Sequence, residues 1–270
     1  KKEGFLKVIS IFSFLGIMLG VAILIIVMSV MNGFKNDLTK KILGLNPHII
    51  IESNGFKIKD EFIEILKKKN KDITISKTYS GEGIVVGKDI AKGIIIKGID
   101  SKNQKSINFL KKNITNGDLE EFKKNTAYIG AELAFNLDLK VGDKINLMSS
   151  VFVTTPFGGL PKQETLTIAG IFNTGFYQFD QNFVFLNLFD VLSIFDKEEY
   201  EQNLEIYLKN PMKANITKDK IQKLNENYFV YSWSDLNKSF FSALKVERNV
   251  MFIILTLIII VAAFNIISGL

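Results

Sequence analysis

The chain has 270 residues, 47% of them hydrophobic, and its 34 basic and 28 acidic side chains leave a formal charge of +6. It contains no cysteine, which excludes disulfides and thiol chemistry. The lysines are interleaved with acids, as in "LKKKNKD", a pattern typical of solvated helix faces, so we predict no nucleic-acid-binding surface.

Two stretches, residues 8–34 and 249–270, lack charged side chains altogether. Each is long enough to cross the hydrocarbon core, which takes about 20 apolar residues as a helix. We therefore predict membrane-spanning helices within residues 1–34 and 249–270. The first stretch is too long for a signal peptide and no small-x-small cleavage site follows it, so we expect it to be retained.

Small and polar residues inside these spans predict packing against other helices. Gly16 and Gly20 have the G-x-x-x-G spacing that lets two helices approach closely. Asn265 lies at membrane depth and is expected to bond to a neighbouring helix. Lysines flank the first span on both sides, so charge alone does not give its orientation.

Residues 35–248 are predicted to form one water-exposed domain. An amphipathic helix is expected over 60–70, with Phe62, Ile63 and Leu66 on one side. Later in the chain we predict a helix over 214–227, and strand-then-helix segments over 126–139 and 183–195. Strands rich in β-branched residues are predicted over 83–89, 92–100, 142–150, 164–174, 203–210 and 228–233.

These elements follow no strict βαβ rhythm, so we assign the domain to the α+β class. No helix breaker separates the amphipathic residues after Ser234 from the apolar stretch, which predicts one helix running from the domain into the membrane. The same continuity is expected at the exit of the first span. Whether such helices act as levers or only as stalks stays open.

The segment "VTTPFGGLPKQET", residues 153–165, separates two predicted strands. It holds Pro156 and Pro161, two of the four prolines, around a Gly158–Gly159 pair. The apolar residues Phe157 and Leu160 lie between them. Taken alone, these residues favour an ordinary long hairpin.

Catalytic constellations are missing from the sequence. His48 is the only histidine and precedes a strand, a position typical of a structural role. There is no His/Cys cluster, no G-x-S-x-G elbow and no phosphate-binding loop. The acidic pairs Glu120–Glu121 and Glu198–Glu199 are interpreted as surface charge. We therefore predict no enzyme activity, no metal site and no cofactor in this chain, so that ATP hydrolysis would come from another subunit.

Several longer segments resemble the lipoprotein-releasing permeases of the LolC/LolE family. They are "GIMLGVAILIIVMSVMNGFKNDLTKKILGLNPHI", "IKGID", "YIGAELAFNLDLKVGDKINLM", "TPFGGLPKQ" and "VERNVMFIILTLIIIVAAFNIISGL". They cover nearly all of the chain in the family's order, and only residues 197–228 match loosely.

The resemblance implies a four-span subunit of the bacterial inner membrane, related to the MacB-type exporters, with a large periplasmic domain between the first two spans. Its expected partners are a second permease subunit (the same or a paralogue), a LolD-type ATPase that uses ATP and magnesium, acylated lipoprotein, membrane lipid and the periplasmic chaperone LolA. The later spans lie outside this sequence, so the fragment is expected to be inactive as a transporter.

The resemblance also gives the proline-containing segment a role. In LolC-like proteins a loop here, at about residues 150–165, is the hook that recruits LolA. The expected hook residues are Thr155, Pro156, Phe157, Gly158, Gly159, Leu160, Pro161 and Gln163. Family hooks often carry arginines nearby, whereas this chain has Gly159 and Glu164, so the polar contacts are expected to differ.

Acyl chains of the lipoprotein are expected to contact the two spans near the periplasmic leaflet. The candidate contacts are Val27, Met28, Met31, Met251, Phe252 and Leu255. Two alternatives remain beside lipoprotein release. One is a MacB-like exporter with another cargo, and the other is a membrane-anchored sensor or scaffold whose domain only binds a partner.

Overall fold

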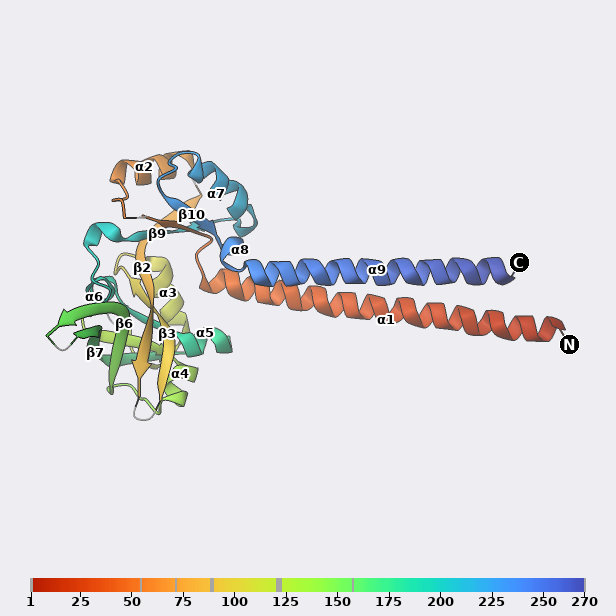
Figure 1. The fold of residues 1–270 in the computed structure, drawn as a ribbon, viewed down its shortest axis with the longest axis horizontal. Helices are drawn as coiled ribbons and strands as arrows, with labels where there is room; N and C mark the ends of the chain where they lie inside the picture. Colours follow the sequence, from red (N-terminus) through yellow and green to blue (C-terminus); the bar gives the residue numbers. More distant parts are fainter. Residues whose placement is uncertain are drawn as a thin grey trace. The chain divides into compact units, whose positions relative to one another are not determined.

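The computed structural model describes residues 2–53, 55–70, 72–87, 90–119, 123–156 and 158–269. They divide into two compact units, drawn as ribbons in Figure 1. One unit combines Lys1–Gly44 with Ser234–Leu270, and the other is Leu45–Trp233.

The first unit consists mainly of two long helices, α1 (Lys2–Leu45) and α9 (Lys238–Gly269). Their parts Phe14–Gly44 and Lys238–Phe264 are long and apolar enough to cross a membrane. Only 6% and 0% of the most apolar windows are buried, whereas the core helix of a soluble protein would be mostly buried. These apolar surfaces are therefore available to lipid or to other helices.

The continuity predicted at the exit of the first span is confirmed, because α1 runs without interruption to Leu45. At about 1.5 Å per residue, such a helix is far longer than the roughly 30 Å hydrocarbon core. The second predicted helix is interrupted: a short helix, α8 (Trp233–Leu236), precedes α9. The break falls at Asn237, whose carbonyl accepts a hydrogen bond from the Phe241 amide at 3.2 Å, as the residue that caps a new helix does.

The strands of Leu45–Trp233 form one mixed sheet, and part of it closes into a ring. In the order of pairing, the ring runs β2–β3–β8–β5–β7–β6 and returns to β2. Its strands are β2 (Ile73–Val86), β3 (Ala91–Ile99), β5 (Thr126–Gly130), β6 (Lys144–Thr155), β7 (Gly158–Phe172) and β8 (Phe183–Asn187).

The ring surrounds a core of alternate apolar side chains, including the fully buried Val85, Ile96, Ile129, Leu147 and Ile168. A closed ring of strands leaves fewer free edges and gives each strand one inward-facing and one outward-facing row. Two short helices, α4 (Ala131–Asn136) and α6 (Leu188–Ile194), add Leu133, Val191 and Ile194 to this core.

The first half of β2 leaves the ring and pairs with β9 (Asn203–Leu208), which is followed by β1 (Ile49–Glu52) and β10 (Phe229–Ser232). Helices α2 (Asp60–Lys69) and α7 (Ala214–Gln222) belong to this part, as Figure 1 shows. Strand β4 (Ile114–Gly117) pairs with the other end of the sheet, at β7. An aromatic cluster around Phe172, Phe179 and Phe185 packs against α3 (Gln104–Asn113) and α5 (Tyr177–Asn182). Short 3₁₀ helices occupy Glu199–Glu201 and Pro211–Lys213.

The predicted α+β class is confirmed, since the sheet mixes antiparallel pairs with the parallel pairs β3–β8 and β5–β7. The predicted helix over 60–70 is α2, and both Phe62 and Leu66 are buried in it. Residues 35–44 and 238–248, which the sequence assigned to the domain, are parts of α1 and α9.

A buried ion pair joins the two parts of the sheet across β2. The Nζ atom of Lys97 on β3 lies 2.6 Å from Oε1 of Glu205 on β9, and the two side chains are 9% and 2% exposed. The hydroxyl of Tyr207 donates to the other carboxylate oxygen at 2.8 Å. Burial, together with this carboxylate, holds the pKa of Tyr207 far above its ordinary value, so the hydroxyl stays a donor.

This arrangement predicts a strong asymmetry between single and double substitutions. Lys97→Met leaves the Glu205 carboxylate buried without its cation and should destabilise the domain by about 3–5 kcal/mol. Combining it with Glu205→Leu should recover most of that loss, because no buried charge remains. Urea denaturation of the detergent-solubilised chain, followed by the fluorescence of the single tryptophan, Trp233, measures both. Wild-type stability in Lys97→Met alone would contradict this account.

Candidate functional site

The segment 153–165 forms a hairpin, as its residues taken alone favoured, but the connection between the two strands is short rather than long. Strand β6 continues to Thr155, and β7 begins at Gly158. Their pairing includes Phe152 with Pro161 and Val153 with Leu160. Figure 1 shows the ends of the two strands extending beyond the rest of the sheet. The run "VFVTT" is rich in β-branched residues, which explains why the strand persists where turn residues predicted a loop.

Glycine and proline have defined places in this hairpin. Gly158 has a φ of +115°, a conformation that side-chain-bearing residues rarely adopt. Pro161 lies beside a register shift between Met148 and Phe152, where the loss of an amide donor costs least. The hydroxyl of Ser149 accepts a hydrogen bond from the Val151 amide at this irregularity.

Polar contacts fix the base of the hairpin to the rest of the domain. The Lys162 ammonium lies 3.1 Å from Oδ1 of Asp196, and the Ser193 hydroxyl donates to Oε1 of Glu164 at 3.0 Å. Glu164, where an arginine was expected from the family pattern, is therefore used within the domain.

The end of the hairpin carries apolar side chains on both faces. Val153 and Leu160, which pair on one face, are 47% and 56% exposed. Phe152, on the opposite face, is 67% exposed. Apolar side chains held in water are stabilised when a partner covers them, so this end has the chemistry of a docking surface.

The expected hook residues lie together in this hairpin. Pro156, Gly158, Gly159, Leu160 and Gln163 are all exposed, and Pro161 is half-buried. Phe157 and the side chain of Thr155 lie outside the described residues. Phe152 and Val153 lie within the expected hook, at about residues 150–165, but were not among its named residues. The available signal was the β-branched run over residues 151–155, which continues the strand into the supposed loop.

An apolar hollow of about 650 Å³ adjoins the base of the hairpin. Its lining includes Ile84, Ile94, Met148, Phe152 and Pro161. The apolar surface of the hairpin therefore continues onto the outer face of β2 and β3.

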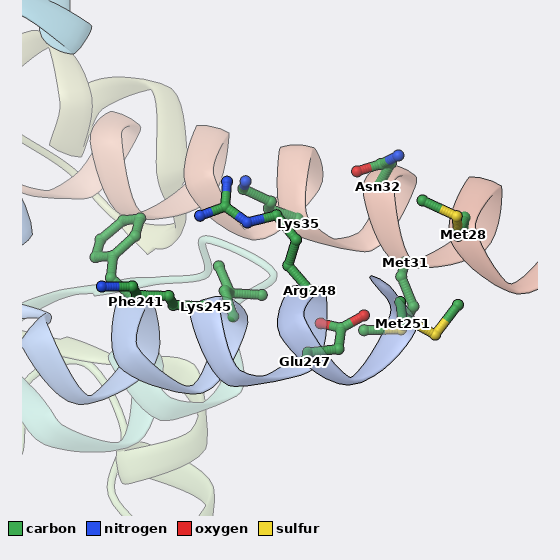
Figure 2. A pocket seen from close by; sticks show the side chains of 10 residues that line it. Met28, Met31, Asn32, Lys35, Phe241, Lys245, Glu247, Arg248 and Met251 are labelled. Atoms are coloured by element: carbon green, nitrogen blue, oxygen red, sulfur yellow. The ribbon is translucent and has the colours of Figure 1, made fainter. Parts of the chain in front are cut away.

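In the helical unit, a groove of about 400 Å³ lies between α1 and α9. Figure 2 shows its lining side chains. From α1 come residues spaced as one helical face, Met28, Met31, Asn32 and Lys35; from α9 come Phe241, Leu244, Lys245, Glu247, Arg248 and Met251.

The structure brings three predicted lipoprotein contacts together in this groove and separates the others from it. Met28, Met31 and Met251 line it. Val27 and Phe252 are exposed and Leu255 is half-buried, and none of the three is among the lining residues. The sequence did not predict the polar and charged part of the lining, because only the packing of α1 against α9 brings these residues together. They are Asn32, Lys35, Lys245, Glu247 and Arg248.

A second, more apolar groove of about 360 Å³ contains the predicted packing residues. Gly16 and Gly20 line it with residues of α9 such as Ile254 and Ile258. A methyl group on Gly20 would lie 3.9 Å from Cδ1 of Ile258, ordinary van der Waals contact, whereas one on Gly16 would meet nothing within 4 Å. The side chain of Asn265 lies outside the described residues.

His48, interpreted from the sequence as structural, is buried, and Glu198, interpreted as surface charge, is exposed. Nδ1 of the buried His48 accepts a hydrogen bond from the Leu208 amide at 2.8 Å, and its ring meets the Tyr207 ring edge-on. Glu198 is exposed and caps a 3₁₀ helix, while Glu120 and Glu121 lie outside the described residues. Among the described residues, no three His, Cys, Asp or Glu side chains form a group that could hold a metal ion.

The chain is similar to a known domain family and to several known proteins. The MacB-like periplasmic core domain family matches residues 10–224. The "Lipoprotein-releasing system transmembrane protein LolC" of Buchnera aphidicola subsp. Schizaphis graminum is 34% identical over 98% of this chain, and that of Xylella fastidiosa is 27% identical over 100% of it. The chain spans 66% of the length of each of these relatives. The crystal structure of the periplasmic region of MacB from Actinobacillus actinomycetemcomitans covers 73% of this chain and 94% of its own, with 11% identity and a TM-score of 0.44.

These findings confirm the resemblance drawn from the sequence and the predicted location, with two spans in the inner membrane and the intervening domain in the periplasm. Because the match covers most of the sequence, the chain belongs to the family of MacB-like periplasmic core domains, and over its whole length it is similar to the LolC proteins.

Proposed function

We propose that this chain is the non-catalytic permease subunit of an ATP-driven complex that releases lipoproteins from the inner membrane and passes them to a LolA-type chaperone. The observation that carries the proposal is the projecting hairpin, whose Val153–Leu160 pair is exposed although apolar. The similarity to lipoprotein-releasing system proteins supports the lipoprotein cargo. The ATPase and the second permease subunit would be separate chains.

The hairpin is suited to docking because little of it has to become ordered on binding. Its two strands pair to Thr155 and Gly158, its base is fixed by Lys162 and Glu164, and Pro156 restricts the turn. A preorganised ligand loses less conformational entropy when it binds, which favours affinity. The chaperone would then cover the apolar end of the hairpin.

The groove between α1 and α9 is the proposed contact for the lipoprotein. Met28, Met31 and Met251 give it a flexible apolar wall that accepts acyl chains of different shape. The lipoprotein would reach it from the membrane and leave it for the chaperone.

Chaperone binding tests the role of the hairpin. Leu160→Asp places a charge in the proposed contact and should weaken binding of purified LolA by about 1–3 kcal/mol, the scale of one interface hot spot. Because Leu160 is exposed, the melting temperature of the chain should stay close to that of the wild type. Isothermal titration calorimetry and thermal unfolding of the detergent-solubilised chain measure the two effects.

The matched control is Ile216→Asp, which charges a similarly exposed side chain (61%) on α7. It should leave chaperone affinity unchanged. Equal affinities for the wild type, Leu160→Asp and Ile216→Asp would refute the proposed docking surface.

Site-specific crosslinking tests the groove. A photoreactive amino acid at Met28 or Met251 should capture acylated lipoprotein in the assembled complex, because both side chains line the groove. The same probe at the neighbouring Phe252, which is exposed but does not line it, should capture much less. Equal yields at Met251 and Phe252 would indicate general contact with the membrane and would count against a cargo site.

A further inference from the structure

Positive charge gathers at one end of the groove between α1 and α9. Lys35, Lys245 and Arg248 line it together, and Glu247 is the only carboxylate among the lining residues. Three cations and one anion leave an excess of two positive charges. Figure 2 shows Arg248 reaching from α9 toward Lys35 on α1. Among the described residues, no ion pair within 4.0 Å neutralises these three cations.

The sequence places this charge at a defined depth. Lys35 is the first charged residue after the uncharged stretch 8–34, and Arg248 is the last before the uncharged stretch 249–270. Charges at the ends of apolar spans lie at the membrane–water interface, the level of lipid phosphates. Met28, Met31 and Met251 lie on the apolar side of that level, so the groove changes from cationic to apolar toward the membrane interior.

We infer that this groove binds a glycerophospholipid, with its phosphodiester among Lys35, Lys245 and Arg248 and an acyl chain along the three methionines. The guanidinium of Arg248 offers paired donors that match phosphate oxygens, and the ammonium groups add charge. The order of polar and apolar groups along the groove matches the order within the lipid. This inference does not depend on the proposed lipoprotein release, since any protein with this groove in a bilayer would bind the lipid.

A helix of another subunit fits the same place less well. An apolar helix packed over Lys35 and Arg248 would take both charges out of water without compensation, which is costly. A phosphodiester supplies the missing negative charge and keeps its own contact with water. If lipoprotein also uses the groove, it has to displace this lipid.

Native mass spectrometry of the detergent-solubilised chain, titrated with palmitoyl-oleoyl-phosphatidylglycerol, tests the inference. We expect one tightly bound lipid. Lys35→Gln combined with Arg248→Gln should weaken its binding roughly 25-fold, because each cation near an anionic lipid surface contributes a factor of roughly five. Lys35→Arg combined with Arg248→Lys keeps both charges and should retain binding within a few-fold.

The control variant combines Lys40→Gln with Lys238→Gln, which removes one exposed lysine from each of the same helices outside the groove. It should bind the lipid like the wild type, and dioleoylglycerol, which lacks phosphate, should bind at least tenfold more weakly. An equal loss in the control would overturn the site in favour of general attraction. If dioleoylglycerol bound as tightly as the phospholipid, the proposed role of the phosphate would be overturned. If inorganic phosphate bound as tightly as the phospholipid, the assignment to a lipid would be overturned. If no lipid bound at all, the site itself would be overturned.

Discussion

The pairing of β6 with two neighbours determines the architecture of the domain. Residues 146–149 of β6 pair with β2, which closes the ring of strands around its core, while residues 144–148 and 152–155 of β6 pair with β7. Residues 152–155 of β6 pair with β7 alone, and there the apolar side chains Phe152, Val153 and Leu160 are exposed. The same strand thus completes the core and forms the projecting end of the hairpin. The proposed docking surface is rigid because it continues a strand that the core already fixes.

The membrane imposes the second constraint, since two long uncharged helices must lie beside lipid or protein. In α1 and α9 the side chains that face each other change character along the axis, from Gly16 and Gly20 with isoleucines, through methionines, to Lys35 and Arg248. That gradient follows the polarity of half a bilayer. A groove with this gradient suits amphiphilic molecules, and both proposed occupants, the acylated protein and the phospholipid, are amphiphiles.

Local patterns in the sequence predicted the elements well and their assembly poorly. The helix α2 and the strands β3, β5 and β9 could be predicted because apolar periodicity and flanking turn residues are local signals. The closure of the ring could not, because the register of β2 with β6 depends on contacts between residues at least 60 positions apart. Prolines and glycines suggested a loop at residues 153–165. The strand tendency of Phe152 and Val153 outweighed them, since the partner strand supplies the hydrogen bonds.

In the candidate sites too, residues that are close in sequence could be predicted, whereas residues that only the fold brings together could not. The hook residues could be proposed from the sequence because they form one contiguous segment that resembles the corresponding segment of the family. The charged lining of the groove was not, because Lys35 and Arg248 are distant in sequence and become neighbours only when α1 packs against α9. The buried pair of Lys97 and Glu205 was hidden for a similar reason, as lysine-rich segments ordinarily indicate solvent exposure.

The first and last strands of the domain are neighbours, with Ile49 opposite Ser232 in the antiparallel pair β1–β10. The chain therefore enters and leaves the domain at almost the same point. An unfolded loop of this length between two spans would let their ends wander widely, and bringing those ends together would carry an entropic cost that grows with the logarithm of loop length. Once folded, the domain removes that cost and tethers the two spans as a linker of only a few residues would.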